Sequence, residues 1–335
     1  MDKKLLILLL ALTVSGCLND MEYTAKNAEP VLVMNSLLTA GDGTHEVWLG
    51  VSKPGCVDSL TGAATVRCFI NGSLAATASE QPGDNRLRRF TFPASFNPGD
   101  KVRIEVSAGS FNASATVSVP APPVLESVDT LTVGDPESPD LAFRIGLTDK
   151  TPGADYYSLR IYGISQIDLF WEDALVESTE FVRLCNLDTG EDLILSEDNI
   201  AAANMDDVFD VGTPNRYGAF FDSQFDCRSV TLRPKVSRWE LDSWYLPTFT
   251  AYDSTYVRPS LRVELSHIDG RYYYYLKALN SLENGTSDLA LEETAIPCNV
   301  EGGMGFVGIA NTVSRSFTLP EYSSLNSYDD DPVYE

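Results

Sequence analysis

The stretch from Gly303 to Gly308 reads GMGFVG and has the G-x-G-x-x-G spacing with which glycines let a backbone approach a dinucleotide. That chemistry also needs a strand before the motif, a helix after it and an acidic residue about 20 positions further on. The sequence after Gly308, IANTVSRSFTLPEY, is polar and contains Pro320. We therefore interpret the glycines as a bulge or close backbone approach in a strand, and we expect no cofactor.

A second chemically distinctive residue is Cys17, which follows MDKKLLILLLALTVSG. Two lysines, an apolar run too short to span a bilayer and small residues before the cysteine are typical of a secretory signal. The last four residues, VSGC, resemble the bacterial lipoprotein box, in which the thiol is acylated and the chain is cut before it. We expect residues 1–16 to be a signal peptide, cleaved between Gly16 and Cys17. The alternative is an ordinary signal peptide that ends in a chance cysteine.

Acylation of Cys17 would make the lipid bilayer the first partner of the chain, since several acyl chains on one residue anchor a protein stably. Leu18 follows the cysteine, where an aspartate would favour retention in the inner membrane. We therefore expect a lipid-anchored protein of the outer membrane.

Five further cysteines are present: Cys56, Cys68, Cys185, Cys227 and Cys298. None forms a C-x-x-C pair, which argues against zinc ribbons and thioredoxin-like redox chemistry. An exported protein meets an oxidising compartment, where a disulfide between Cys56 and Cys68 would close a short loop between two expected strands. The odd number leaves at least one thiol free.

Catalytic patterns are weak throughout the sequence. The two histidines, His45 and His267, lie in strand-like segments, where a structural histidine is the commoner case. Neither H-E-x-x-H nor G-x-S-x-G occurs. A glycosidase with paired carboxylates is the enzymatic alternative, but many acidic residues do not by themselves place two together. We expect a protein that is not an enzyme and has no catalytic residue.

The chain is strongly acidic, with 24 basic and 48 acidic residues and a net charge of −24, which excludes nucleic acid as a partner. The segment from Asp168 to Asp210 is the most acidic and has a single basic residue, Arg183. We interpret it as a solvated insertion, with a site for a hard cation or a cationic ligand as the alternative. No D-x-D-x-D-G loop is present, so we expect no metal.

Aromatic residues are the candidates for ligand binding. Three of them lie close together in RWELDSWYLP, and the full set is Trp171, Trp239, Trp244 and Tyr245. Planar rings beside carboxylates suit the capture of a small ligand, a glycan or a peptide. The alternative is that these rings fill the core or cover a sheet edge.

The elements that must position these residues are mostly strands. After a polar tether at 17–27, residues 28–120 show short apolar or alternating runs separated by turn signals such as Asn71-Gly72. Such spacing, with no amphipathic helix, predicts a β-sandwich of immunoglobulin-like type. The proline-rich PAPP, from Pro120 to Pro123, marks its boundary.

Residues 121–320 predict a second β-rich domain. The acidic segment interrupts a series of strand-like runs: LAFRIGLTD, DYYSLRIYGIS, FVRLCN, YGAFFDSQFDCRSVTLRPKVS and YVRPSLRVELSHI. DGRYYYYLKALNSLENG predicts a helix with apolar residues on one face, and EDNIAAANMDDVF a short one. Residues 321–335 predict a disordered acidic tail. The expected fold is all-β, with two sandwich domains, a long acidic insertion and one or two short helices.

Five stretches in this order resemble the Bacteroidetes surface lipoproteins grouped as domain of unknown function family 4249. They are VSGC, PVLVMNSLLTAG followed by VWLGVSK, YGAFFDSQFDC, RYYYYLKALN and CNVEGGMGFVGIANT. The resemblance covers most of the chain after the signal. It implies an outer-membrane lipoprotein at the cell surface that serves a TonB-dependent receptor in nutrient uptake, and it supplies no catalytic residues.

We accordingly expect a non-catalytic accessory that binds a TonB-dependent receptor or its cargo. A carbohydrate-active enzyme and a structural or adhesive surface protein are the alternatives. Three triplets also resemble the O-glycosylation acceptor of exported proteins in such bacteria, with Ser59, Thr130 and Ser254 as the acceptor residues.

Overall fold

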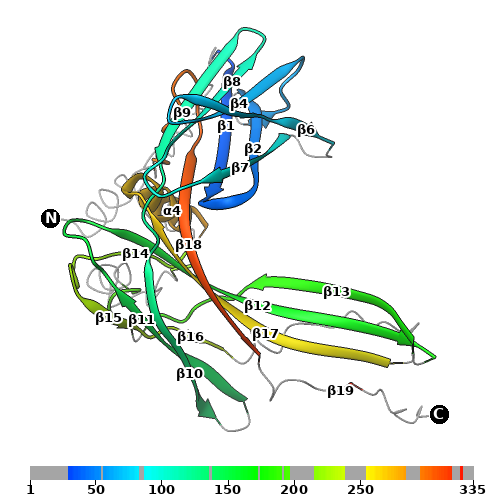
Figure 1. Ribbon diagram of the computed structural model, residues 1–335, viewed down its shortest axis with the longest axis vertical. Helices are drawn as coiled ribbons and strands as arrows, with labels where there is room; N and C mark the ends of the chain where they lie inside the picture. The colour runs from blue at the N-terminus through cyan, green and yellow to red at the C-terminus, as the bar shows by residue number, and fades with distance from the viewer. Residues whose placement is uncertain are drawn as a thin grey trace, which may run out of the picture.

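The computed structural model describes residues 29–53, 56–82, 87–135, 138–172, 174–190, 192–196, 215–237, 254–283, 295–318 and 325–326. In these ranges the protein consists of strands and one helix (Figure 1), so the all-β expectation is confirmed. Gly16, Cys17 and the expected helix in EDNIAAANMDDVF lie outside the described residues. The expected tail does as well, except that Leu325–Asn326 forms a short strand, β19, on β17.

The first sandwich encloses a core of aliphatic and aromatic side chains between two sheets. One sheet contains β1 (Val31–Thr39), β2 (Gly41–Lys53), β3 (Cys56–Asp58), β6 (Ser79–Gln81) and β7 (Arg88–Phe96). The other, in the order β5-β4-β8-β9, contains β4 (Ala64–Ile70), β5 (Ser73–Thr77), β8 (Lys101–Ala108) and β9 (Phe111–Ser118). Met34, Phe90 and Ile104 are among the side chains buried between them. Alternating burial along β8 is what a period of two places in such a core.

Turn chemistry fixes the register of this sandwich as the sequence predicts. Asn71 and Gly72 both have positive φ, 51° and 82°, which the tight hairpin between β4 and β5 requires. At the turn between β7 and β8, Asn97 N donates to Asp100 Oδ2 at 2.8 Å, and Gly99 has a φ of 86°. A side-chain oxygen thus accepts a hydrogen bond from a backbone N–H that strand pairing leaves unpaired, and glycine adopts the positive φ that the turn needs.

The second sandwich is built from longer strands. Its large sheet contains β12 (Tyr156–Trp171), β13 (Ala174–Leu184), β14 (Ala219–Phe221), β17 (Ser254–Ile268) and β18 (Val307–Thr318). The facing sheet contains β10 (Val124–Asp135), β11 (Ser138–Thr148), β15 (Ser229–Leu232) and β16 (Lys235–Val236). Side chains such as Phe143, Ile161 and Val263 are fully buried between the two sheets.

Strand β18 belongs to both sandwiches. Its first half pairs in parallel with β1, and its second half pairs antiparallel with β17. Val307 and Ile309 lie in the first core, whereas Val313 and Phe317 pack on the second. The boundary expected at Pro120 therefore separates the two cores only in part, because residues near 300–310 return to the first sandwich.

The helix predicted in DGRYYYYLKALNSLENG is present as α4 (Gly270–Glu283), and it lies where the sandwiches meet. Asp269 Oδ1 accepts a hydrogen bond from Tyr272 N at 2.7 Å and caps the helix. The ring of Tyr275 stacks on Phe306, just before β18, with centroids 4.2 Å apart. Tyr272, Tyr273 and Leu276 are among its buried residues, whereas Leu282 is exposed. No helix in the described ranges has the length and apolar composition that a bilayer crossing needs.

The segment from Asp168 onward is not simply a solvated insertion. Its first part, through Leu184, completes β12 and forms β13 in the large sheet. Asp168 is buried and pairs with Arg258 of β17 at 2.6 Å. Figure 1 shows the far ends of β12, β13 and β17 extending together away from the sandwiches, and we call this projection the arm. The acidic composition suggested a loop. Instead, residues 168–170 pair with β17 and β13 pairs with β12, so this part of the segment belongs to the sheet.

Candidate functional site

Two turns of the second sandwich bring acidic residues together. One joins β11 to β12 and carries Asp149 and Asp155, and the other joins β14 to β15 and carries Asp222 and Asp226. The pairing of β12 with β14 and of β11 with β15 places the turns side by side. Two backbone bonds hold them: Asp222 N donates to the Asp155 carbonyl, and Asp149 N to the Arg228 carbonyl, both at 3.1 Å.

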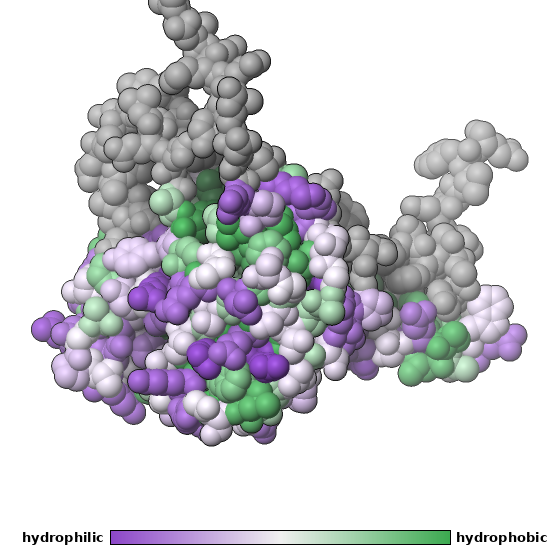
Figure 2. All heavy atoms as spheres, turned by 90° about the horizontal axis from the view of Figure 1, so that it is seen from above, coloured by the Kyte–Doolittle hydropathy of each residue, from purple (hydrophilic) through white to green (hydrophobic). Residues whose placement is uncertain are grey.

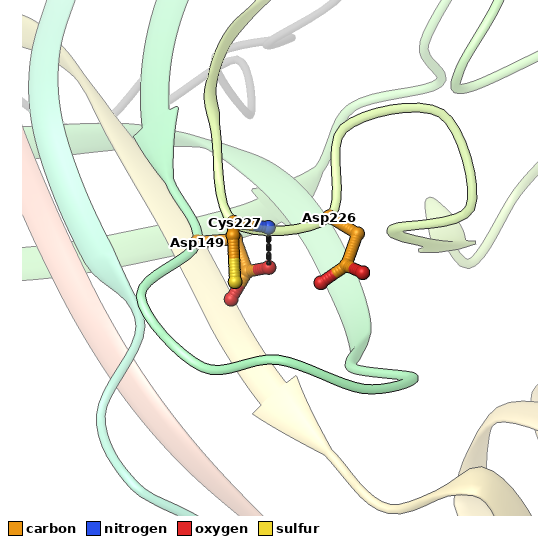
Figure 3. Close-up of side chains that lie close together, drawn as sticks. All are labelled: Asp149, Asp226 and Cys227. Carbon is orange, nitrogen blue, oxygen red and sulfur yellow. Dashed lines mark hydrogen bonds between the residues drawn. The ribbon is translucent and has the colours of Figure 1, made fainter.

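Carboxylate oxygens of Asp149, Asp155 and Asp222 lie within 4.8 Å of one another, and we call these residues the aspartate cluster. Asp149 and Asp222 are only 3% and 2% exposed. A second group shares Asp149 and adds Asp226 and the Cys227 sulfur within the same limit (Figure 3). Groups of this kind can hold a cation, because carboxylate oxygens are the ligands of hard metal ions.

Hydrogen bonds orient two of the three carboxylates in the aspartate cluster. Asp149 Oδ2 accepts from Cys227 N at 2.7 Å, the bond drawn in Figure 3, and Asp149 Oδ1 accepts from Thr151 N at 3.1 Å. Asp155 accepts from the Thr151 hydroxyl and faces His267 Nε2 at 3.2 Å. Asp222 differs, because its Oδ2 is buried and has no hydrogen-bond partner.

Burial and neighbouring charge shift the protonation of this region. Burial raises the pKa of Asp222, and the charges of Asp149 and Asp155 raise it further. Desolvation, with the nearby carboxyls of Asp226 and Asp149, also raises the pKa of the Cys227 thiol. A thiol held in its protonated form is a poor nucleophile and a poor ligand for soft metals. The aspartate cluster itself offers carboxylate oxygens, so the chemistry that it supports is oxygen ligation.

His267 joins the aspartate cluster to the proline linker. Its Nδ1 lies 2.9 Å from the Ala121 carbonyl, and its Nε2 lies 3.2 Å from Asp155 Oδ1. Both partners are oxygen atoms, so each ring nitrogen faces one hydrogen-bond acceptor. The ring also stacks on Tyr157, with centroids 5.2 Å apart. His45 is buried in the first sandwich, with its Nε2 3.3 Å from the Ala94 carbonyl. Both histidines thus have structural partners.

The expected aromatic ligand site is only partly described. Trp171 ends β12 on the arm and is 50% exposed. Trp239, Trp244 and Tyr245 lie outside the described residues.

The arm exposes apolar side chains along its outermost described strand. Within the described strands β13 pairs with β12 alone and ends the order of the large sheet. Four of its apolar side chains are between 45% and 56% exposed: Leu175, Val176, Phe181 and Val182. Figure 2 shows a hydrophobic patch at the right-hand end of the molecule, the end toward which the arm extends in Figure 1. The sequence predicted only the end of this strand, in FVRLCN, because the acidic residues before Phe181 suggested a loop.

A shallow hollow of about 440 Å³ opens on the first sandwich beside α4. Its lining includes Asp42, Glu46 and Trp48 of β2 and Tyr275 of the helix. Asp42 and Glu46 are the acidic residues of this lining and lie four residues apart on one strand.

The disulfide expected between Cys56 and Cys68 is not formed in this structure. Cys56 is exposed on β3, whereas Cys68 is buried in the first core on a strand of the facing sheet, and both are free thiols. Burial raises the pKa of the Cys68 thiol to about 11, so it remains a small apolar core residue. The prediction failed because two nearby positions in the sequence lie on opposite sheets.

The three triplets that resemble glycosylation acceptors lie at separate places. Ser59 is exposed after β3, and Thr130 is exposed on β10. Ser254 begins β17. No structural feature groups them into one site.

The aspartate cluster was not predicted from the sequence. Its members follow no linear metal-binding spacing, and the third, Asp222, comes from a turn about 70 positions after the first two. The available signal was that aspartates stand directly after two strand-like runs, LAFRIGLTD and YGAFFD.

Comparison with known proteins identifies the family and little else. No curated protein matches the chain. Three solved structures that the chain resembles are each 9% identical to it in sequence. They include a DUF4785 family protein from Legionella pneumophila, with a TM-score of 0.20 over 69% of this chain and 51% of that one. Trypsin-activated alpha-2-macroglobulin from Escherichia coli gives 0.22 over 72% and 14%.

Beta-glucuronidase 3 from Bacteroides uniformis gives a TM-score of 0.20 over 72% of this chain and 23% of that one. This chain thus spans about half of the first structure and less of the other two, and the TM-scores are too low to establish a shared fold. The family model described as "Domain of unknown function (DUF4249)" matches residues 19–316, which include both sandwiches and the arm. The chain belongs to the DUF4249 family.

Proposed function

We propose that this protein is an outer-membrane lipoprotein, displayed at the cell surface, that acts as a non-catalytic accessory of a TonB-dependent uptake receptor. The observation that carries the proposal is the arm, whose strand β13 presents apolar side chains outside both cores. The lipid anchor is inferred from VSGC near the start of the chain, and the class of partner is inferred from the family resemblance.

The arm has the features of a surface that another protein covers. Leu175 and Val176 lie near its tip, and Phe181 and Val182 lie further along the same strand. Full burial of one such side chain is worth about 1.5–3 kcal/mol, so covering the row would stabilise a complex substantially. A partner strand placed along β13 would combine main-chain hydrogen bonds with these side-chain contacts.

Membrane anchoring favours such a contact. A lipid on Cys17 would confine the protein to the same membrane as its receptor, which raises the effective concentration of each for the other. The contact through a single strand can then have a modest affinity, and the binding site on the receptor is still occupied.

A structural or adhesive protein is the second candidate, because the same strand could pair with the arm of another copy. Exposed strands at a sheet edge are templates for such association. The two candidates differ in the partner that β13 contacts, a receptor or a second copy of this chain.

The test is gentle detergent extraction of the native outer membrane through a tag near Glu335, followed by mass spectrometry of the material that co-purifies. The accessory function predicts a TonB-dependent receptor in near-equal amount. Recovery of the protein alone would contradict it, and recovery of a homo-oligomer would favour the adhesive candidate. Replacement of Leu74, which is 57% exposed on β5 of the first sandwich, supplies a control for changes on β13.

A further inference from the structure

The side chain of Asp222 is buried without a partner for one of its oxygens. The residue is 2% exposed, and Oδ2 has no hydrogen-bond partner. Buried polar atoms are nearly always hydrogen-bonded, and an ionised carboxylate is the costliest group to leave unpaired. The position of Asp222 therefore indicates a positively charged partner other than the protein's own groups.

The neighbours of Asp222 add negative charge. Oxygens of Asp149 and Asp155 lie within 4.8 Å of its carboxylate, and Asp149 is also buried. Asp155 also faces His267 Nε2 at 3.2 Å. Three carboxylates gathered in so small a volume suit a cation that carries more than one charge.

We propose that Asp149, Asp155 and Asp222 bind one calcium ion between the turn after β11 and the turn after β14. Calcium takes oxygen ligands at about 2.3–2.6 Å, so two ligands on opposite sides of the ion are separated by about 4.6–5.2 Å. The three carboxylate oxygens fit within that span. Asp226 lies beside the cluster, where it can supply a further ligand directly or through water.

The donor atoms decide which metal the site takes. The group that contains Asp222 is composed of carboxylate oxygens alone, which suits calcium. The overlapping group includes the Cys227 sulfur, and zinc is the ion that would prefer it. Both groups use Asp149, so one ion occupies the site in either case.

Calcium in this position would stabilise the base of the second sandwich. The two turns contact each other through only a few backbone bonds, and the ion would join them through three side chains. Asp155 also contacts His267, which holds the linker at Ala121. This inference does not depend on the function proposed above.

The test is calorimetric titration and thermal unfolding of the purified full-length chain, with CaCl₂, MgCl₂ and ZnCl₂ added separately at physiological ionic strength. We expect one calcium ion per chain, with a Kd of about 10⁻³ M or tighter, and a Tm that rises with calcium concentration. Asp222→Asn keeps the shape of the side chain and is expected to weaken calcium binding at least ten-fold. Without calcium its Tm should equal or exceed that of the wild type.

The chain is so acidic that weak calcium binding at its surface needs a control. Asp129→Asn removes a carboxylate from exposed β10 and should leave the specific binding unchanged. If Asp222→Asn does not fold, Asp155→Asn is expected to give the same loss. The proposal is wrong if millimolar calcium neither binds nor raises Tm, if both cluster variants keep wild-type affinity, or if zinc binds tightly and Cys227→Ser abolishes it.

Discussion

Gly305 is the residue at which the glycine-rich stretch meets the first sandwich most closely. It has a φ of 113°, and a Cβ built on it would lie 2.2 Å from the Met34 carbonyl oxygen. On either side of it, Met304 N donates to the Leu32 carbonyl and Phe306 N to Asn35 Oδ1. The interpretation of GMGFVG as a close backbone approach is thereby confirmed.

Replacing Gly305 by alanine should destabilise the first sandwich. The positive φ costs about 1–3 kcal/mol for a residue with a side chain, and the clash with β1 adds to that cost. Gly99→Ala is the matched control, because Gly99 has a φ of 86° but open space around its Cβ position. Urea unfolding should show a clearly larger loss for Gly305→Ala, and equal losses would mean that close approach contributes nothing.

His45 should make stability depend on pH. Burial lowers its pKa below 6.5, and its ring packs on Phe92 and Phe96. The folded state therefore disfavours the protonated ring, while the unfolded chain binds a proton as the pH falls through about 6.5. The free energy of unfolding should decrease from pH 7 downward and stop decreasing, for this residue, below its folded pKa.

The measurement is denaturant unfolding at several pH values between 7.5 and 5. His45→Gln should lose part of the pH dependence, whereas His267→Gln should keep the part that His45 causes. A wild-type slope that survives His45→Gln unchanged would contradict the assignment.

Other residues show where sequence reasoning ends. The Asn71-Gly72 turn was predictable because its backbone conformation depends on two adjacent residues. Asp149 and Asp222 were not, because strand pairing across the fold brings them together.

At the scale of elements, helix α4 and most strands follow from local patterns. The helix expected in DGRYYYYLKALNSLENG spans Gly270–Glu283, and its first turn is capped by Asp269. The strand-like run FVRLCN marked only the end of β13, since Glu177 and Glu180 made its first part resemble a solvated loop. Its pairing with β12 over ten register positions outweighs that local preference.

A lysine on β13 should impair partner binding without affecting the fold. Val182 is 47% exposed, so Val182→Lys should change the free energy of unfolding by no more than about 0.5 kcal/mol. A charge there opposes the approach of an apolar partner strand. Recovery of the receptor from detergent extracts should fall several-fold for Val182→Lys and remain unchanged for Leu74→Lys. Equal recovery from both variants would remove β13 from the proposed contact.

At the scale of the whole molecule, β18 links the two sandwiches. Ile309 is 1% exposed in the first core, and eight positions later Phe317 packs on the second. The proline-rich stretch from Pro120 to Pro123 was recognisable from residues adjacent in the sequence. The return of β18 to β1 was not, because it pairs residues more than 270 positions apart.

The shared strand predicts that both sandwiches unfold in one transition. Ile309→Ala in the first core and Ile161→Ala in the second should each cost about 2–5 kcal/mol. Differential scanning calorimetry should show one peak that both variants shift to lower temperature. Two peaks, each shifted by one variant only, would show that β18 does not couple the sandwiches.

The central claim is that the arm docks a receptor in the outer membrane, and photocrosslinking from β13 tests it most directly. A photoreactive residue replaces Val182 in intact cells of the native organism, with Leu74 on β5 as the control position. The account predicts a crosslink from position 182 to a TonB-dependent receptor and none from position 74. Crosslinks from 182 to copies of this chain alone, or equal crosslinks from both positions, would contradict it.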